Sequence, residues 1–403
     1  MQQLAPSEAA LLERVDAAPM LAQVQAWSAI NTGTANLAGL ANQAALLADA
    51  FAALPGAVKL EQPGPVQAVS PAGAEIRVEY GQHLVLRVRP EAQRRFLLTG
   101  HMDTVFPASD PFQSQTWLDE ATLNGPGVAD MKGGIAVILA ALTAFETSDA
   151  ASTAGYDVMI NSDEETGSLS SVPLIAQLAQ GKAAALTYEP SALPDGTLAG
   201  ARAGSGNWSV TVRGKSAHAG RNPDDGRNAL VAAAALALGL KALHRDGLSV
   251  NPAKIDGGSA NNVVPDLAVL RFNIRPRELA AADEFLIALK ALIARVETEH
   301  QVSVHLHGGI SRPPKPVDAR AEKLFGIVEQ CSALLGAPVT RIASGGVCDG
   351  NNIAACGVPV VDTMGVRGGA IHSPDEFLIV PSLEERAKLS ALVLHRLATG
   401  APL

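Results

Sequence analysis

The sequence contains little cysteine, no long run of hydrophobic residues and no excess of positive charge. Its three cysteines, Cys331, Cys348 and Cys356, occur without a Cys-x-x-Cys spacing, which argues against a disulfide framework and against a thiolate zinc site. The 31 basic residues are outnumbered by 40 acidic residues, for a net charge of -9. General affinity for nucleic acid or for anionic lipid is therefore not expected, and a small molecule is the expected partner.

Neither a membrane-spanning helix nor an export signal is predicted. The longest apolar run, residues 229–240, is shorter than the roughly 18 residues that a spanning helix needs, so it is interpreted as a buried helix. Residues 1–51 lack a basic start followed by an apolar run and a small-residue cleavage site. We therefore expect a cytoplasmic protein without a membrane partner.

The order of the periodic segments predicts an α/β fold. The 403 residues, 47% of them apolar, are enough for a large core and more than one domain. In the first half, helices and strands alternate in the order helix 36–54, strands 83–88 and 95–100, helix 131–146, and strands 157–161 and 183–188. Such alternation is typical of a largely parallel sheet with helices on both faces.

A second alternating block begins near residue 204 and predicts an inserted domain. It comprises strand 207–212, helix 226–244, strand 268–274, helix 280–299 and strand 302–307, followed by a proline-rich connector at 310–317. The first pattern then resumes with helix 319–335, strand 358–363 and helix 382–397. We predict a catalytic domain from residues 1–203 and 314–403, interrupted by a smaller α+β domain at 204–313.

Polar side chains follow or close the apolar strands of the predicted catalytic domain. They occur in Thr-Gly-His-Met-Asp, Val-Ala-Asp-Met-Lys, Ser-Asp-Glu-Glu-Thr, Tyr-Glu-Pro and Ile-His-Ser-Pro. Groups beyond the carboxyl ends of strands in an open α/β sheet converge on one crevice. The sequence therefore brings together five candidate ligands of a metal site: His101, Asp130, Glu165, Glu189 and His372.

Two imidazoles and three carboxylates suit zinc, which accepts nitrogen and oxygen ligands. A carboxylate has two oxygens, so one aspartate can bridge two ions, and a pair of ions can activate water and polarise a carbonyl. We predict that Asp130 is this bridge. Asp103 follows His101 by two residues, a spacing that places both side chains on one face of a strand, where its carboxylate can accept the free imidazole N–H.

The adjacent pair Glu164 and Glu165 can divide two tasks, because neighbouring side chains point in different directions. One can bind metal, while the other takes a proton from water and delivers it to the leaving amine. We assign Glu165 to the metal and Glu164 to proton transfer. Each motif considered alone also fits an ordinary turn, a helix N-cap or a structural histidine; five compatible ligands at strand ends favour the metal site.

These motifs resemble the aminoacylase/carboxypeptidase/desuccinylase family of zinc hydrolases over about residues 97–372, and within it most closely the glutamate carboxypeptidases, including the folate-cleaving bacterial type. The resemblance implies two Zn²⁺ per subunit, with Co²⁺ or Mn²⁺ as possible substitutes. It also implies half-sites of His101 with Glu189 and of Glu165 with His372, bridged by Asp130. Glu164 falls on the family's general base, Asp103 supports the ligands, and a cis peptide follows Asp130.

The resemblance extends into the inserted domain, which it identifies as a ferredoxin-like lid and dimerisation domain. His218, in Gly-Lys-Ser-Ala-His-Ala-Gly, matches a histidine that reaches the partner subunit's active site and stabilises the oxyanion. The substrate-binding positions implied by the family are Asn262, Arg275, Arg312, Gly345 and Gly346. Arginine binds carboxylates through its fork of donors, so a substrate with a free carboxylate is expected.

The expected function is hydrolysis of an amide or peptide bond beside a free C-terminal carboxylate by a homodimeric di-zinc carboxypeptidase. An N-acyl amino acid deacylase of acetylornithine or succinyl-diaminopimelate type would use the same metal chemistry and stays open as an alternative. A non-catalytic small-molecule binding protein is a second alternative. Cys348 stands where relatives commonly carry serine or threonine before Asp349, so either a thiol in the specificity pocket or a buried small residue is compatible with the sequence.

Overall fold

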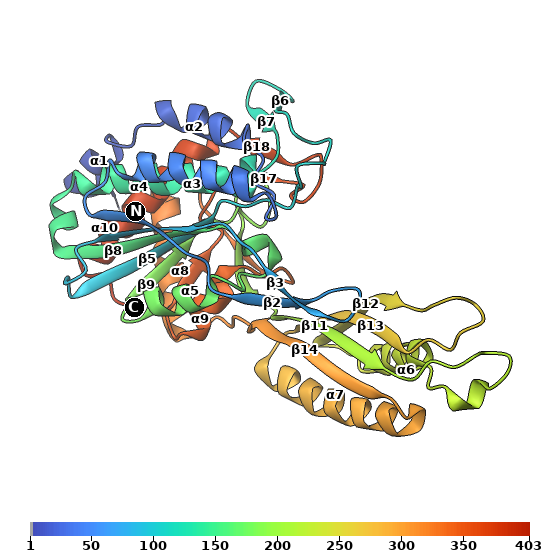
Figure 1. Ribbon diagram of the computed structural model, residues 1–403. Coiled ribbons are helices and arrows are strands. Elements are labelled where there is room, and N and C mark those ends of the chain that lie inside the picture. The colour runs from blue at the N-terminus through green and yellow to red at the C-terminus, as the bar shows by residue number, and fades with distance from the viewer. Residues whose placement is uncertain (1–2) are drawn as a thin grey trace.

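The computed structural model describes residues 3–403 and is built around an eight-stranded sheet, here called the central sheet (Figure 1). Four of its neighbouring pairs are parallel and three are antiparallel. The strands lie in the order β1 (Ala57–Glu61), β4 (His83–Val88), β8 (Ala154–Asn161), β5 (Arg94–His101), β9 (Ala184–Thr187), β16 (Val360–Asp362), β10 (Leu198–Arg202) and β15 (Arg341–Ser344). The predicted α/β class with a mixed, mostly parallel sheet is confirmed.

Helices cover both faces of the central sheet because successive side chains along its strands are apolar. In β4, Leu84 and Leu86 enter the largest hydrophobic cluster, whereas Val85 enters a smaller cluster on the opposite face. The larger cluster contains residues of α1 (Pro6–Leu12), α2 (Ala18–Ser28), α3 (Leu37–Phe51), α4 (Gly134–Glu146), α8 (Ala319–Leu334) and α10 (Ser382–Ala398). The smaller one contains residues of α5 (Val172–Ala179) and α9 (Asp349–Ala355).

The helix expected at 131–146 begins later than predicted. Residues Val128–Gly133 form a π-helical turn containing a cis peptide between Asp130 and Met131, and α4 follows directly. By length and composition the stretch Val128–Glu146 is apolar enough to cross a membrane, but 94% of its apolar window is buried in the fold. A Cβ on Gly134 would lie 2.1 Å from the Tyr188 carbonyl oxygen, so glycine here allows the turn to approach the loop after β9.

A second, antiparallel sheet projects from the body of the molecule (Figure 1); it is here called the distal sheet. Its strands lie in the order β12 (Leu248–Gly257), β13 (Leu267–Pro276), β11 (Ser205–Arg213) and β14 (Ser303–Arg312). The helices α6 (Ala229–Ala242) and α7 (Leu279–His300) pack on it around Trp208, Phe272 and Phe285. This β-α-β-β-α-β order is that of a ferredoxin-like unit.

A hairpin of β2 (Val66–Val69) and β3 (Glu75–Val78) connects the body to the distal sheet. Arg271 donates a hydrogen bond to the Val69 carbonyl at 3.0 Å, and His307 Nε2 lies 3.0 Å from the Gln67 carbonyl oxygen. A small four-stranded sheet lies beside the body, with the strands β17 (Gly368–Gly369), β18 (Phe377–Ile379), β7 (Thr122–Asn124) and β6 (Thr116–Trp117).

Several predicted boundaries are wrong for identifiable reasons. The helix expected from residue 226 begins at Ala229, where the Asn228 side chain accepts the Val231 N–H and caps the first turn. The connector expected from residue 310 begins after Arg312, because β14 stays paired with β11 up to that residue. The short strands β2, β3, β6, β7, β10, β15, β17 and β18, the longer β1 and β12, and the helices α1, α2, α5 and α9 were not predicted.

Candidate metal centre

The candidate ligands lie at the carboxyl ends of neighbouring parallel strands. His101 is the last residue of β5, while Glu165 and Glu189 follow β8 and β9 within a few residues. β5 pairs in parallel with both β8 and β9, so the three chain segments end at one edge of the sheet. Asp130 enters from the turn before α4, and His372 from the loop after β17.

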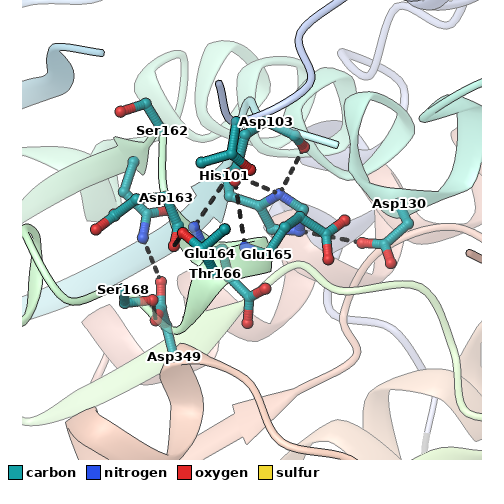
Figure 2. Close-up of polar contacts among 12 residues, drawn as sticks. His101, Asp103, Asp130, Ser162, Asp163, Glu164, Glu165, Thr166, Ser168 and Asp349 are labelled. Atoms are coloured by element: carbon teal, nitrogen blue, oxygen red, sulfur yellow. Dashed lines mark hydrogen bonds and ion pairs between the residues drawn. The ribbon is translucent and has the colours of Figure 1, made fainter. Parts of the chain in front are cut away.

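The two carboxylate oxygens of Asp130 face two different histidines. His101 Nε2 lies 3.0 Å from Asp130 Oδ1 and 3.6 Å from Glu189 Oε2. His372 Nε2 lies 3.3 Å from Asp130 Oδ2 and 3.1 Å from Glu165 Oε2. Each histidine thus has its own glutamate, and both share one aspartate that is 5% exposed. Figure 2 shows Asp130 and Glu165 on the same side of His101.

Asp103 supports the candidate ligands by contacts with His101 and with the loop that contains Glu164 and Glu165. It does not lie in a strand with His101, because β5 ends at His101, so the strand-face argument for their proximity is wrong. Its carbonyl oxygen is nevertheless 3.0 Å and its carboxylate 3.4 Å from His101 Nδ1. The carboxylate also accepts the backbone N–H groups of Glu164 and Glu165, both at 3.2 Å (Figure 2). One buried side chain therefore orients a histidine and the loop that carries both glutamates.

Glu164 differs from Glu165 in its partner. Arg312 Nη2 lies 2.8 Å from Glu164 Oε1 and donates to the Glu164 carbonyl at 2.9 Å, whereas the Glu165 carboxylate faces His372. Glu164 is also close to His101 and Glu189, so all three donor atoms lie within 4.8 Å of one another. Burial raises the pKa of Glu164 well above its usual value against the opposing charge of Arg312.

Glu376 supports the Asp130 turn from the opposite side. Its carboxylate accepts the backbone N–H groups of Gly127, Ala129 and Asp130, each at 3.0 Å. It is fully buried, and burial together with the charge of Asp130 raises its pKa to about 7. The position of Asp130 between the two histidines thus depends on a residue four positions after His372.

The donor set and its electrostatics fit divalent cations. The pKa of Glu165 rises to about 7 through burial and the charge of Asp130, and burial likewise raises the pKa of Glu189. Glu189 Oε1 is buried and has no hydrogen-bond partner among the described residues. The ion pairs with Asp130 and Glu165 raise the pKa of His372 to about 11. Concentrated buried carboxylates are stable when a cation compensates them.

A cavity of about 810 Å³ opens beside this cluster. It is lined by four of the predicted ligands, the predicted base and four of the predicted substrate residues: Asp130, Glu165, Glu189, His372, Glu164, Arg275, Arg312, Gly345 and Gly346. His101 and Asp103 lie behind this surface and are buried. Cys348 lines the cavity as well and is 1% exposed.

His218 and Asn262 are not part of this cavity wall. His218 follows β11 and Asn262 precedes β13, so both lie in loops at the outer end of the distal sheet. Ala219 donates its N–H to the Asn262 carbonyl at 2.9 Å, and His218 forms an isolated bridge with Val263. Within one chain, the fold brings these two residues to each other but not to the metal cluster.

The model for peptidase family M20/M25/M40 matches residues 97–396 of this chain. The chain belongs to this family. It is therefore a metal-dependent hydrolase, and the resemblance to the aminoacylase/carboxypeptidase/desuccinylase group is confirmed. Family membership also removes the non-catalytic binding protein from the alternatives.

Two M20 relatives are similar over most of their length. Carboxypeptidase G2 of Pseudomonas sp. (strain RS-16) is 28% identical over 335 residues, which cover 79% of this chain and 78% of the relative. Succinyl-diaminopimelate desuccinylase of Xanthomonas oryzae pv. oryzae (strain PXO99A) is 29% identical over 322 residues, covering 75% and 83%. The two relatives differ in substrate, so identity alone does not choose between a carboxypeptidase and a deacylase.

Solved structures share the fold. The aminopeptidase PepT from Bacillus cereus ATCC 10987 has a TM-score of 0.71 at 18% identity, covering 96% of this chain and 100% of that one. The Bacillus subtilis YXEP protein, a dinuclear metal binding peptidase from the M20 family, has a TM-score of 0.67 at 14% identity, covering 94% and 97%. At these low sequence identities, the structural similarity establishes a shared fold.

Sequence reasoning missed three buried residues of this M20 site. Glu376 was not considered, and Asp349 was named only as the neighbour of Cys348. In the structure Asp349 receives the Asn161 side-chain N–H at 2.8 Å and also pairs with Ser168. Arg202, at the end of β10, lines the cavity. The available signal was the same for all three: a charged residue directly beside an apolar strand or helix start.

Proposed function

We propose that this M20 hydrolase cleaves an amide or peptide bond next to a free C-terminal carboxylate. The observation that carries the proposal is the geometry of the Asp130 carboxylate: one oxygen faces His101 and the other faces His372. Such an arrangement supports two adjacent cation sites with one bridging carboxylate. The half-sites are then His101 with Glu189, and Glu165 with His372.

Zinc is the proposed metal because the donors are two imidazoles and three carboxylates, and Co²⁺ or Mn²⁺ would find the same donors. When bound, the two ions would supply Lewis acidity for the substrate carbonyl and lower the pKa of a water molecule. Asp103 and Glu376 keep the protein side of the site in place, because they fix the His101 ring and the Asp130 turn.

Glu164 is the proposed proton carrier. Its carboxylate lies beside the cluster and lines the cavity, while Arg312 binds one of its oxygens. The other oxygen can take a proton from the attacking water and give it to the nitrogen of the leaving amine. The contacts of Arg312 support a positioning function for this arginine in addition to the substrate binding that we predicted.

His218 is the proposed oxyanion donor, delivered by the partner subunit. Its Nδ1 accepts the backbone N–H groups of Gly220 at 3.1 Å and Arg221 at 3.2 Å, so the ring proton resides on Nε2. A neutral imidazole with an exposed Nε2–H can donate to a developing negative charge. Because His218 lies far from its own cavity, we propose a homodimer in which residues 204–313 form the lid and dimerisation domain and residues 1–203 and 314–403 the catalytic domain.

Arg275 is the proposed ligand of the substrate's terminal carboxylate. It is half-buried in the cavity wall, and its Nε donates to the Asn273 side chain at 3.1 Å, which leaves its terminal nitrogens for the substrate. Gly345 and Gly346 provide a wall without side chains, and Asn262 would come from the partner's lid. A cytoplasmic location is consistent with three free cysteines, two of them buried.

A panel of substrates tests this function. The zinc-loaded enzyme is incubated with N-acyl amino acids and dipeptides, each with a free or an amidated C-terminus, and the released amine is measured. We expect turnover of the free acids and at least about a 100-fold lower kcat/KM for the amides, because a charged hydrogen bond to arginine is lost. Equal rates for both series would contradict the proposal.

A deacylase is the second candidate, favoured by the similarity to succinyl-diaminopimelate desuccinylase. It would use the same metal centre and the same base, and it would differ in the half of the substrate that the enzyme recognises. The panel separates the two candidates: a carboxypeptidase distinguishes among released amino acids, whereas a deacylase distinguishes among acyl groups on one amino acid.

A further inference from the structure

Two short segments connect the central sheet to the distal sheet, and they lie against each other. The chain leaves β10 through Ala203 and Gly204 to enter β11, and it returns from β14 through Pro313 and Pro314. A Cβ on Gly204 would lie only 2.8 Å from Pro314 Cδ, so glycine allows this close approach. The orientation of the distal sheet relative to the body therefore depends on what holds these two connections.

Asn351 binds both connections with one side chain. It lies in the first turn of α9 and is fully buried. Its Nδ2 donates to the Ala203 carbonyl at 2.9 Å and to the Pro313 carbonyl at 2.8 Å, while its Oδ1 accepts the Cys348 N–H at 3.1 Å. Because both protons and the oxygen of the amide are used, the position of each connection is fixed relative to α9.

The same turn of α9 also holds the loop that carries Glu164. The first residue of the helix, Asp349, is 3% exposed, forms a hydrogen bond with the Ser168 hydroxyl (Figure 2) and accepts the Asn161 side-chain N–H at 2.8 Å. The loop is closed by the Gly167 N–H, which donates to the Glu164 carbonyl at 2.9 Å. One helical turn is thus a common support for this loop and for the two connections.

Arg312 joins the two groups of contacts. It directly precedes Pro313, its Nη2 lies 2.8 Å from Glu164 Oε1, and the same nitrogen donates to Ser168 Oγ at 2.8 Å. If Pro313 shifts relative to α9, Arg312 moves with it, whereas Glu164 stays with the loop that Asp349 holds. Misplacement of a reacting group by about 1 Å can cost on the order of 100-fold in rate, so the reaction is sensitive to this register.

We propose that Asn351 is a positioning residue of this hydrolase: its amide holds both connections against α9 and thereby keeps Arg312 in register with Glu164. The inference rests on the proposed function, in which Glu164 carries the proton. Asn351 does not line the cavity of the metal cluster, and it acts on the reaction through Pro313 and Arg312.

A double-mutant cycle of Asn351→Ala and Arg312→Met tests the proposal. The alanine variant should lower kcat of the zinc-loaded enzyme by about 10- to 100-fold, because two buried hydrogen bonds are lost and the arginine leaves its register. If Asn351 acts through Arg312, the double variant should be within about 3-fold of Arg312→Met alone. Independent losses that multiply in the double variant would overturn the proposal.

Asn352→Ala is the matched control, because Asn352 is also a buried amide of α9, but its Nδ2 has no hydrogen-bond partner within residues 3–403. Its kcat should stay within about 3-fold of the wild type, and an equal loss in both variants would overturn the proposal. Metal content and thermal unfolding are measured for each variant. Asn351→Ser, whose hydroxyl can donate to one of the two carbonyls, should lose less than Asn351→Ala and replaces it in the cycle if the alanine variant does not fold.

Hydrogen exchange in D2O, measured by mass spectrometry, locates the effect without any reaction. The N–H groups of Ala203 and Gly204 donate to the carbonyls of Ser344 at 3.1 Å and Pro276 at 2.7 Å. In Asn351→Ala these two amides should exchange faster than in the wild type, because the connection is no longer held against α9. Unchanged exchange there, or an equal increase over the whole body, would overturn the proposal.

The two measurements separate this inference from the proposed function. If the zinc-loaded wild type cleaves no amide, the proposed function fails, and hydrogen exchange still shows whether Asn351 holds the connections. If amides are cleaved and the losses of Asn351→Ala and Arg312→Met multiply, the positioning by Asn351 fails and the proposed function stands.

Discussion

Arg312 Nη2 lies 2.8 Å from Glu164 Oε1, and the same guanidinium donates to the Glu164 carbonyl and to the Ser168 hydroxyl. One buried arginine thereby fixes both the backbone and the side chain of the proposed proton carrier. Arg312 ends β14 of the distal sheet, so the proposed lid and the catalytic loop meet at this contact.

Arg312→Met should lower kcat by about 10- to 100-fold with little change in KM, because it removes charged hydrogen bonds that orient Glu164. Steady-state kinetics with metal content as a control measures the effect. If Arg312 acts chiefly as a ligand of the substrate carboxylate, KM rises while kcat is retained.

Glu164→Gln should lower kcat by about 10²- to 10⁴-fold, the usual contribution of a general base. Zinc content is expected to stay at the wild-type level, because the proposed ligand beside it is Glu165. The exposed Glu120→Gln is the matched control. Near wild-type turnover of Glu164→Gln with full zinc content would show that another group carries the proton.

Removal of the metal should abolish activity and lower Tm, and added Zn²⁺ should restore both. A cation that binds only the folded chain stabilises it by about 4 kcal/mol at a thousand times its Kd, and the buried carboxylates repel one another without it. Scanning calorimetry before and after dialysis against a chelator measures the change. An unchanged Tm after verified metal loss would contradict this account of the cluster.

His372→Ala tests the two half-sites separately. It removes one ligand of the Glu165 half-site, so bound zinc is expected to fall from about two ions per chain to about one, with Asp130 left as a ligand of the remaining ion. Elemental analysis counts the ions, and the exposed His305→Ala serves as the control. Loss of neither ion would place the second site elsewhere.

Mixing two inactive variants tests the delivery of His218 by the partner. His218→Ala and Glu164→Gln homodimers should each be nearly inactive. After subunit exchange, about a quarter of wild-type activity should appear, because each mixed dimer combines an intact Glu164 with an intact His218 at one of its sites. If His218 served its own chain, the mixture would stay inactive.

His83 makes stability depend on pH. Burial is the main cause that lowers its pKa to about 4 from 6.5, so between these pH values the unfolded chain binds the proton that the folded chain does not. The stabilisation is complete above pH 6.5 and is lost as the pH falls towards 4, by up to about 3 kcal/mol. Urea unfolding at pH 7.5 and 5 measures the loss.

The His83→Gln variant is the control for the pH dependence of stability. His83→Gln keeps a side chain that can accept the Ser162 N–H, which His83 Nδ1 receives at 3.3 Å, but it has no proton to gain. Its stability should change less between pH 7.5 and 5 than that of the wild type. The same slope in both proteins would assign the pH dependence to other groups.

The main elements of the fold could be predicted because they follow local periodicity. Apart from the exposed Arg87, the residues of β4 and β8 are buried, and each strand contains a short apolar run, at 84–86 and 158–160. The buried side chains of α7 recur at helical spacing. The hairpin β2–β3 and the two-residue strands β6 and β17 could not be predicted in this way. Their stability comes from contacts with distant segments, such as Arg271 with Val69.

The identity of the five proposed ligands was determined by the sequence alone, because each side chain has the donor that a zinc ion needs and stands beside an apolar strand. Tertiary structure decided which of them face one another: Asp130 reaches both histidines because a turn braced by Glu376 and packed at Gly134 holds it there. The tertiary structure also decided the partners of Arg202 and Arg312. The positive charge of an arginine follows from its covalent structure, but the carboxylates that pair with it come from distant parts of the chain.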